Sequence, residues 1–242
     1  PAIVVGTMPY READTIVRLL TPDHGRVSAL ARNARRSSRR FGGAIDLGNR
    51  IETTIRPSSR GLWNLDAAEL TDGRLNIRTE LGRLGLLAYA CEIAGRLAKE
   101  GHEEPKLFGL LDMACTLLDA ATHTPATGFR LGLETKALTF AGLAPVLDRC
   151  TACGHPPEPP MVLVPHLGGV QHADCATARG VTVSAVWMQA VERFRRQPLR
   201  DNLDTLPPPG PTWAMAEAIE AHLGQPLKSR RVLSSLLTEQ PP

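Results

Sequence analysis

Short apolar segments alternate with polar turns over the first 70 residues of the chain. The segments are rich in valine, isoleucine, leucine and threonine, and each is too short for a typical helix. They lie at residues 2–8, 15–20, 25–32, 50–57 and 62–70. Glycine, proline and aspartate mark the turns between several of them. Five strands at this spacing predict a small antiparallel barrel or sandwich.

The period of the apolar positions changes to a helical one from residue 79. The pattern predicts helices at residues 79–99, 104–121, 125–142, 181–197, 211–223 and 226–238. A proline-rich segment with three cysteines, residues 148–180, interrupts the helical region. The sequence therefore predicts an α+β multidomain protein: a β barrel over residues 1–78, then an α-helical domain over residues 79–242 with a zinc-finger-like insert at about 148–180.

The insert carries two ligand pairs of the type that binds zinc. Cys150 and Cys153 are separated by two residues, as are His172 and Cys175, and 18 residues lie between the pairs. Two such pairs complete a tetrahedral site, which is the arrangement of structural zinc. We expect one structural zinc ion here, the alternative being a metal-free loop with reduced thiols. His155 and His166 are possible substitute ligands, but neither has the two-residue separation from Cys175 that His172 has.

A catalytic zinc site is a second interpretation of the same cysteines. Zinc deaminases combine H-x-E with P-C-x-x-C, and His102 with Glu104 formally supplies the first motif. However, Arg149 stands where the proline is required, and Cys175 would have no role. The remaining two cysteines of the chain lie in apolar helical patterns and are expected in the core.

Positive charge is concentrated in one segment, although the net charge of the chain is only +3. Residues 26–40 contain six arginines and no acidic residue. Five of them are the expected DNA-binding residues: Arg32, Arg35, Arg36, Arg39 and Arg40. Guanidinium groups bind phosphate in a bidentate manner, and small barrels commonly bind nucleic-acid backbones. The alternative is a solvated surface segment without a partner.

Aromatic residues are scarce in the barrel region. Tyr10, Phe41 and Trp63 are the aromatic residues of its first 70 positions, whereas sequence-tolerant single-strand binders stack bases on several aromatic rings. We therefore expect binding to depend mainly on phosphate neutralisation, to be insensitive to sequence and to fall steeply with salt.

Several classes of protein lack support in the sequence. It contains no G-x4-G-K-[ST] nucleotide loop, no G-x-S-x-G motif and no acidic two-metal cluster, so we expect neither an enzyme nor a nucleotide cofactor. No apolar run is long enough to cross a bilayer, and the first residues do not resemble a signal peptide. A cytoplasmic location is the expectation.

Three separated blocks of the chain together resemble the RecO family. The first block runs from Tyr10 to Gly43 and contains Arg32-x2-Arg35-Arg36-x-Ser38-Arg39. The second block is Leu62-Trp63-x-Leu65 with Ala68-Glu69. The third block begins at Phe129-Arg130-Leu131, continues with Cys150-x2-Cys153-Gly154 and ends with Gly168-Gly169-Val170-x-His172-x2-Cys175. Two departures are the asparagine at position 33, where the family favours glycine, and His172 in place of the third cysteine.

The resemblance implies an N-terminal OB fold, a helical domain and a zinc insert. It also implies a DNA-repair and recombination mediator that binds single- and double-stranded DNA, anneals complementary strands without ATP, and acts with RecR to load RecA onto DNA coated by single-strand-binding protein. A nucleoid-associated cytoplasmic protein is expected. Family members bind the acidic C-terminal tail of the coating protein, and Arg130 is the candidate for that contact, the alternative being an ordinary helix-surface arginine.

A function of another class also remains open at this point. The helices and the zinc insert could form a protein–protein adaptor in which DNA contact is secondary. In that case the barrel alone would bind DNA poorly, while the helical domain would keep its partners.

Overall fold

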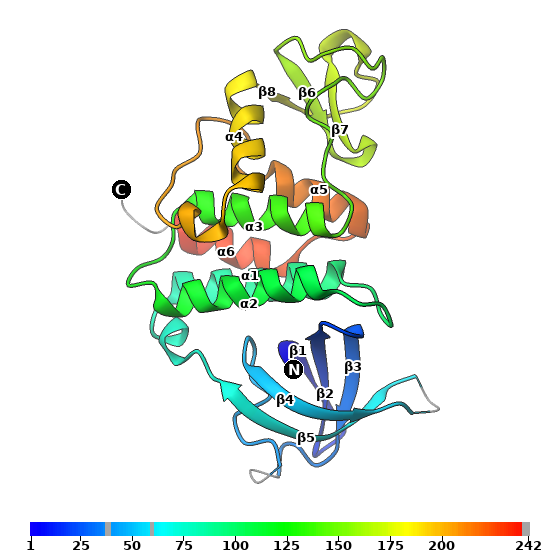
Figure 1. The fold of residues 1–242 in the computed structure, drawn as a ribbon, viewed down its shortest axis with the longest axis vertical. Coiled ribbons are helices and arrows are strands. Elements are labelled where there is room, and N and C mark those ends of the chain that lie inside the picture. Colours follow the sequence, from blue (N-terminus) through cyan, green and yellow to red (C-terminus); the bar gives the residue numbers. More distant parts are fainter. Residues whose placement is uncertain (37–39, 59–60, 239–242) are drawn as a thin grey trace. The chain divides into compact units, whose positions relative to one another are not determined.

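The N-terminal part of the chain is a closed β barrel (Figure 1). The structure is a computed structural model that describes residues 1–36, 40–58 and 61–238. The barrel strands are β1 (Ala2–Tyr10), β2 (Asp14–Thr21), β3 (Gly25–Ala31), β4 (Arg50–Arg56) and β5 (Trp63–Asp72). Their order around the barrel is β1-β2-β3-β5-β4, with β1 also pairing with β4 and β3 running parallel to β5. This is the OB topology, and the expected barrel is confirmed.

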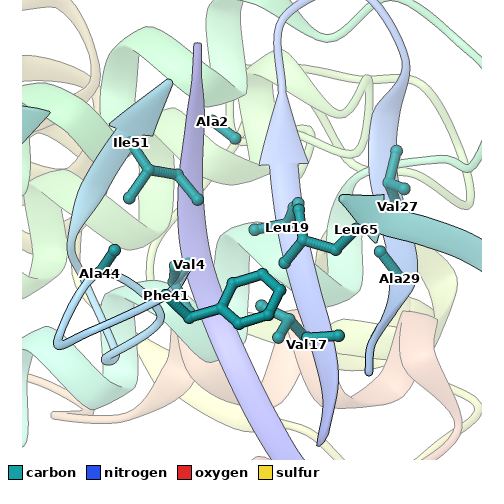
Figure 2. Packing of buried hydrophobic residues seen from close by; sticks show 11 residues of the cluster. Ala2, Val4, Val17, Leu19, Val27, Ala29, Phe41, Ala44, Ile51 and Leu65 are labelled. Atoms are coloured by element: carbon teal, nitrogen blue, oxygen red, sulfur yellow. The ribbon is translucent and has the colours of Figure 1, made fainter. Parts of the chain in front are cut away.

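The barrel core contains the inward-facing residues of the strands together with part of the β3–β4 connection. Strand β3 alternates fully buried with half-buried residues along its length, as a strand with one face in the core should. The connection adds Phe41 and Ala44, which are 2% and 4% exposed. Figure 2 shows the Phe41 ring pointing into the cluster. Burying a phenylalanine of this kind contributes about 1.5–3 kcal/mol, so Phe41 fixes the connection on the barrel.

Six α-helices follow the barrel in the described part of the chain. They are α1 (Leu81–Leu97), α2 (Pro105–Ala120), α3 (Thr127–Phe140), α4 (Ala185–Arg196), α5 (Ala214–Leu223) and α6 (Lys228–Thr238). Four short 3₁₀ helices are η1 (Leu75–Thr79), η2 (Pro165–Leu167), η3 (Ala173–Cys175) and η4 (Leu199–Asn202). Each of the six predicted helices is present, although α3, α4 and α5 begin a few residues later than the apolar pattern indicates.

The cysteine-rich insert contains a small sheet that the sequence pattern did not predict. Strands β6 (Met161–Val164), β7 (Gly169–His172) and β8 (Val181–Val183) form an antiparallel sheet in the order β7-β6-β8. Strands of three or four residues are too short to show a two-residue alternation in the sequence. The sheet gives the insert a framework for its candidate ligands.

The chain divides into two compact units. The first contains residues 1–124 together with helix α6, and the second is Pro125–Leu227. The first unit thus joins the barrel to α1, α2 and the last described helix. The expected domain boundaries, 1–78 and 79–242 with an insert at 148–180, stay predictions. Among the described residues, no helix combines the length and apolar character needed to cross a membrane.

Helix α6 is held on α1 by close packing and by one carboxylate. Glu92 accepts hydrogen bonds from the backbone N–H groups of Lys228 (3.0 Å) and Ser229 (2.7 Å), and from the Ser229 hydroxyl. Burial opposes ionisation of this carboxyl, but these hydrogen bonds outweigh it and hold the pKa of Glu92 below its ordinary value. At Gly85 a Cβ atom would lie 2.9 Å from the Leu236 side chain, so the two helices pack closely at this position.

A buried ionic network joins the barrel to α2 within the first unit. The Arg74 side chain is 2% exposed and forms an ion pair with Asp112. It also donates a hydrogen bond of 3.0 Å from Nη1 to the Gly48 carbonyl. Arg50 of β4 contacts the second oxygen of Asp112 at 2.5 Å. Because a buried guanidinium is costly unless it is paired, Asp112 is essential to this arrangement.

Candidate metal centre and basic loop

The first ligand pair of the insert lies on a tight turn. The backbone N–H of Gly154 donates to the Cys150 carbonyl at 2.9 Å, and the N–H of Cys150 donates to the His155 carbonyl at 2.8 Å. Gly154 has a φ of 77°, which is the left-handed conformation that favours glycine. This turn points Cys150 and Cys153 to a common position.

The second ligand pair comes from the end of β7 and from η3. His172 is the last residue of β7, and Cys175 is the last residue of η3. The segment before the first pair lies against β7, because Val146 and Thr151 exchange backbone hydrogen bonds of 2.9–3.0 Å with Gly168 and Val170. The sheet of the insert therefore brings the two pairs together across a long sequence separation.

The four ligand atoms form one cluster. The Sγ atoms of Cys150, Cys153 and Cys175 and a ring nitrogen of His172 all lie within 4.8 Å of one another. The distance from His172 Nδ1 is 3.4 Å to Cys153 Sγ and 3.9 Å to Cys175 Sγ. A tetrahedral zinc ion with bonds of about 2.0–2.3 Å would separate such atoms by about 3.6 Å, so the cluster fits this ion.

A neighbouring carbonyl fixes the orientation of the histidine. His172 Nε2 lies 3.0 Å from the Pro156 carbonyl oxygen, to which it can only donate a hydrogen bond. This leaves the Nδ1 lone pair free to bind a metal, as in many metal sites where the second ring nitrogen donates to a carbonyl. The cluster can therefore hold a metal ion such as zinc.

The thiols differ in their tendency to ionise. Burial opposes ionisation of Cys150, but the backbone N–H groups of Cys153 and His172 outweigh it and lower the pKa of this thiol to about 6. Burial and the neighbouring thiols raise the pKa of Cys175 to about 11. Without a bound cation the three thiols therefore do not all ionise, whereas a divalent cation would neutralise the negative charge of three thiolates.

The geometry favours a structural over a catalytic role for this centre. Four protein ligands complete a tetrahedral site and leave no position for water. Among the described residues, the metal-type cluster contains neither His102 nor Glu104, which the deaminase interpretation requires. Cys91 and Cys115, the two remaining cysteines, are buried, as expected for core residues.

The basic loop, residues 32–49 between β3 and β4, carries the expected DNA-binding arginines. The side chains of four of them lie on the surface, and these are Arg32, Arg35, Arg36 and Arg40. The fifth, Arg39, lies outside the described residues, as do the two serines that precede it. The loop thus presents arginines on the outside while Phe41 holds it from within.

Hydrogen bonds to the β1–β2 turn fix the start of the basic loop. Asn33 has a φ of 56°, and its backbone N–H donates to Asp14 Oδ1 at 2.9 Å. The backbone N–H of Arg35 donates to the Ala13 carbonyl at 3.1 Å. Asparagine tolerates this left-handed conformation better than most residues do, so the turn does not require glycine at this position.

Two acidic residues partly neutralise the loop. Arg36 forms an ion pair with Glu12 at 3.6 Å, with both side chains largely exposed. Arg40 donates two hydrogen bonds to the backbone carbonyl of Asp66 and lies 4.9 Å over the Phe41 ring, and its charge acts on the Asp66 carboxylate. The exposed ion pair between Arg36 and Glu12 is of a weak type, so Arg36 remains able to exchange Glu12 for phosphate.

Arg56 of β4 belongs to the same basic surface, and sequence reasoning did not select it. It forms an ion pair with Asp66 of β5. A side-chain hydrogen bond from Arg56, and then the charges of Arg40 and Arg32, hold the pKa of Asp66 below its ordinary value. Arg32, Arg40 and Arg56 therefore surround one carboxylate. A two-residue alternation counted from the buried Ile51 would have identified position 56 as outward-facing.

Arg130, the candidate for partner binding, lies in the interior of the second unit. Its side chain is 2% exposed, and its Nη1 lies 2.6 Å from Glu134 Oε1. It also donates to the Thr212 carbonyl at 2.6 Å and lies 3.8 Å over the Trp213 ring. It lines a cavity of about 260 Å³, together with Trp187 and residues 206–212. Arg130 is therefore a buried, paired guanidinium at the wall of a cavity, and not a residue of the helix surface.

The barrel and the Cys3His cluster define a class of protein that combines an OB fold with a helical region and a structural metal-type centre. The model of the N-terminal domain of Recombination protein O matches residues 1–74, and that of its C-terminal domain matches residues 78–231. The chain belongs to the RecO family of DNA-repair and recombination proteins.

Individual relatives agree with this assignment over nearly the whole chain. The DNA repair protein RecO of Anaeromyxobacter sp. strain K is 35% identical over 244 residues, which cover 97% of this chain and 94% of that protein. The protein of the same name from Myxococcus xanthus strain DK1622 is 33% identical over 233 residues, covering 94% and 93%. That of Pelobacter propionicus is 40% identical over 156 residues, covering 64% and 62%.

Proposed function

We propose that the protein binds single- and double-stranded DNA without sequence preference and anneals complementary strands without ATP. The observation that carries this proposal is the basic loop, which presents arginines on an OB barrel while Phe41 and the β1–β2 turn fix its backbone. Guanidinium groups neutralise phosphates of any sequence and release counterions. The family assignment supports a role in repair and recombination.

Annealing on this surface requires no chemical step by the protein. Two DNA strands repel each other, and arginines that exchange rapidly between exposed carboxylates and phosphates lower this repulsion. Base pairing then supplies the driving force. Accordingly, the function is non-enzymatic, and the zinc ion has a structural role: Cys150, Cys153, His172 and Cys175 would hold it and thereby stabilise the insert.

In the cell we propose a recombination mediator in the nucleoid. It would act with RecR to help load RecA onto DNA coated by single-strand-binding protein. The acidic tail of that coating protein would reach Arg130 through the cavity of the second unit. Because Glu134 already neutralises Arg130, the tail carboxylates would share or replace this partner.

An adaptor function remains the second candidate, and the same cavity favours it. Its wall of prolines and Trp187 could bind an extended peptide, with DNA contact secondary. Replacing Arg130 and Glu134 together by methionine and glutamine would remove the ion pair without leaving a buried charge. Loss of binding to an acidic tail peptide, with DNA binding unchanged, would assign the cavity to protein partners.

Salt-dependent DNA binding tests the main proposal. Fluorescent single- and double-stranded oligonucleotides should both bind, and annealing should accelerate in the absence of ATP. Replacing Arg35, Arg36 and Arg39 by glutamine should weaken binding to all sequences. It should also flatten the salt dependence by about 0.7–0.9 per lost phosphate contact. Unchanged affinity would remove the basic loop from the proposal, and absence of binding at low salt would favour the adaptor.

A further inference from the structure

A small pocket lies on the barrel where β3 and β5 begin, and no described residue of the basic loop lines it. Its volume is about 260 Å³, and residues of the first unit line it. Two aromatic rings contribute, those of His24 and Trp63, with centroids 5.4 Å apart and planes inclined by 42°. Arg26, Ser28 and Glu100 also line the pocket. Nothing in the proposed phosphate binding uses these residues.

Backbone contacts make the walls of the pocket rigid. The N–H of Arg26 donates to the Lys99 carbonyl at 3.1 Å, and the N–H of Gly101 donates to the His24 carbonyl at 3.1 Å. At Gly25, where φ is 59°, a Cβ atom would lie 2.1 Å from the Lys99 carbonyl oxygen. The β2–β3 turn and the α1–α2 connection are thus fixed to each other, and a ligand would meet a preformed site.

The chemistry of the pocket matches a planar ring with polar edges. The half-buried Trp63 supplies an indole on which such a ring can stack. Arg26 and Glu100, paired at 3.1 Å, supply hydrogen-bond donors and acceptors, and the Ser28 hydroxyl can act as either. Nucleobases have an apolar face and both donors and acceptors along their edges, so they fit this combination.

The register of the sheet places the pocket next to the basic loop. Trp63 pairs with Ala29 of β3, and the loop begins at Arg32, three residues further along the chain. At about 3.3 Å per residue this separation is about 10 Å, which is the length of a few nucleotides. A strand whose phosphates contact the loop can therefore place a nearby base in the pocket.

We propose that this pocket binds one unstacked base of single-stranded DNA, with Trp63 as the stacking platform and His24 as the second ring. The inference rests on the proposed DNA binding and adds a preference to it. Bases in a duplex are already stacked and paired, so their entry would cost several kcal/mol. The pocket thus gives the protein a contact that single strands make and duplexes do not.

Variants of the full chain test the pocket by fluorescence anisotropy. The changes are Trp63→Ala, Trp63→Phe and His24→Ala, with Phe140→Ala as a control for the loss of an exposed aromatic outside the pocket. The affinity of each variant is measured for a single-stranded oligonucleotide, a blunt-ended duplex of two strands and a single strand of abasic sites. Trp63→Ala should weaken single-strand binding about fivefold or more, since one stacked base contributes about 1–3 kcal/mol.

The pattern across substrates distinguishes stacking from a general effect on the fold. Trp63→Phe should retain most of the affinity, and His24→Ala should lose part of it. Duplex binding should be unchanged in every variant, and wild type and Trp63→Ala should bind the abasic strand equally. Equal weakening on all three substrates, or no weakening at all, would overturn the pocket while leaving the proposed function intact. If the wild-type chain bound no DNA, both proposals would fail.

Discussion

Replacing a single acidic residue should strengthen the proposed binding of DNA. Glu12 lies in the β1–β2 turn, 3.6 Å from the guanidinium of Arg36, and both side chains are largely exposed. Two unit charges at this distance interact by about 1 kcal/mol in water, and measured exposed pairs contribute about 0–1 kcal/mol. DNA must displace this partner before Arg36 can bind a phosphate. Glu12→Gln should therefore raise the affinity by up to about fivefold at low salt.

The assay is titration of a labelled single strand at several salt concentrations. Glu158→Gln is the matched control, because it makes the same change in net charge at an exposed position of the insert. Arg36→Gln should lower the salt slope by about 0.7, and in that background Glu12→Gln should have a smaller effect. If Glu12→Gln leaves the affinity unchanged while Arg36→Gln lowers it, the pair does not compete with phosphate. Equal gains from Glu12→Gln and Glu158→Gln would show that only net charge matters.

Three further predictions concern stability and the metal centre. Asp112→Ala should lower the free energy of unfolding by about 1–3 kcal/mol in urea denaturation, because the nearly buried Arg74 loses its closer charged partner and keeps only the half-exposed Asp72, 3.6 Å away; an unchanged free energy of unfolding would contradict this. The purified protein should contain one equivalent of zinc by atomic absorption. Cys153→Ala should abolish zinc binding and make the insert sensitive to protease, while the barrel stays intact. The pKa of Glu92 is lower in the folded protein than in the unfolded chain, where it is about 4.3. The ionised carboxylate therefore stabilises the fold fully above the unfolded pKa, and this stabilisation is lost as the pH falls through the folded pKa. Glu92→Gln should remove that part of the acid dependence, and an unchanged pH profile would exclude this role.

Local patterns in the sequence were sufficient to predict the barrel and the cluster of metal-type ligands. The barrel strands are short segments rich in valine, isoleucine, leucine and threonine that are bounded by turn residues, and the two ligand pairs have a spacing that few other structures require. By contrast, position 130 looked like a surface residue or a partner contact, because an arginine within an apolar helix gives no sign of a buried acidic partner. The structure shows that partner to be Glu134, one helical turn away.

Contacts between distant segments were the part that the sequence did not predict. The pairing of Arg56 with Asp66 depends on the register between β4 and β5, which no local pattern determines. The small number of aromatic residues in the barrel argued against base stacking. In the structure, however, the Trp63 ring lies beside the ring of His24, which belongs to a turn 39 positions earlier in the sequence. Long-range packing therefore supplied both the additional arginine and the candidate base pocket.

The return of helix α6 to the first unit makes the second unit an insertion within the first. During synthesis the barrel strands and α1 leave the ribosome early, but α6, which packs on α1, begins only at Lys228, whereas α1 ends at Leu97. Until then the apolar surface around Gly85 stays uncovered, and the first unit is incomplete. A nonsense mutation shortly before α6 would therefore damage the unit that contains the barrel, although the missing segment lies far from the barrel strands in the sequence.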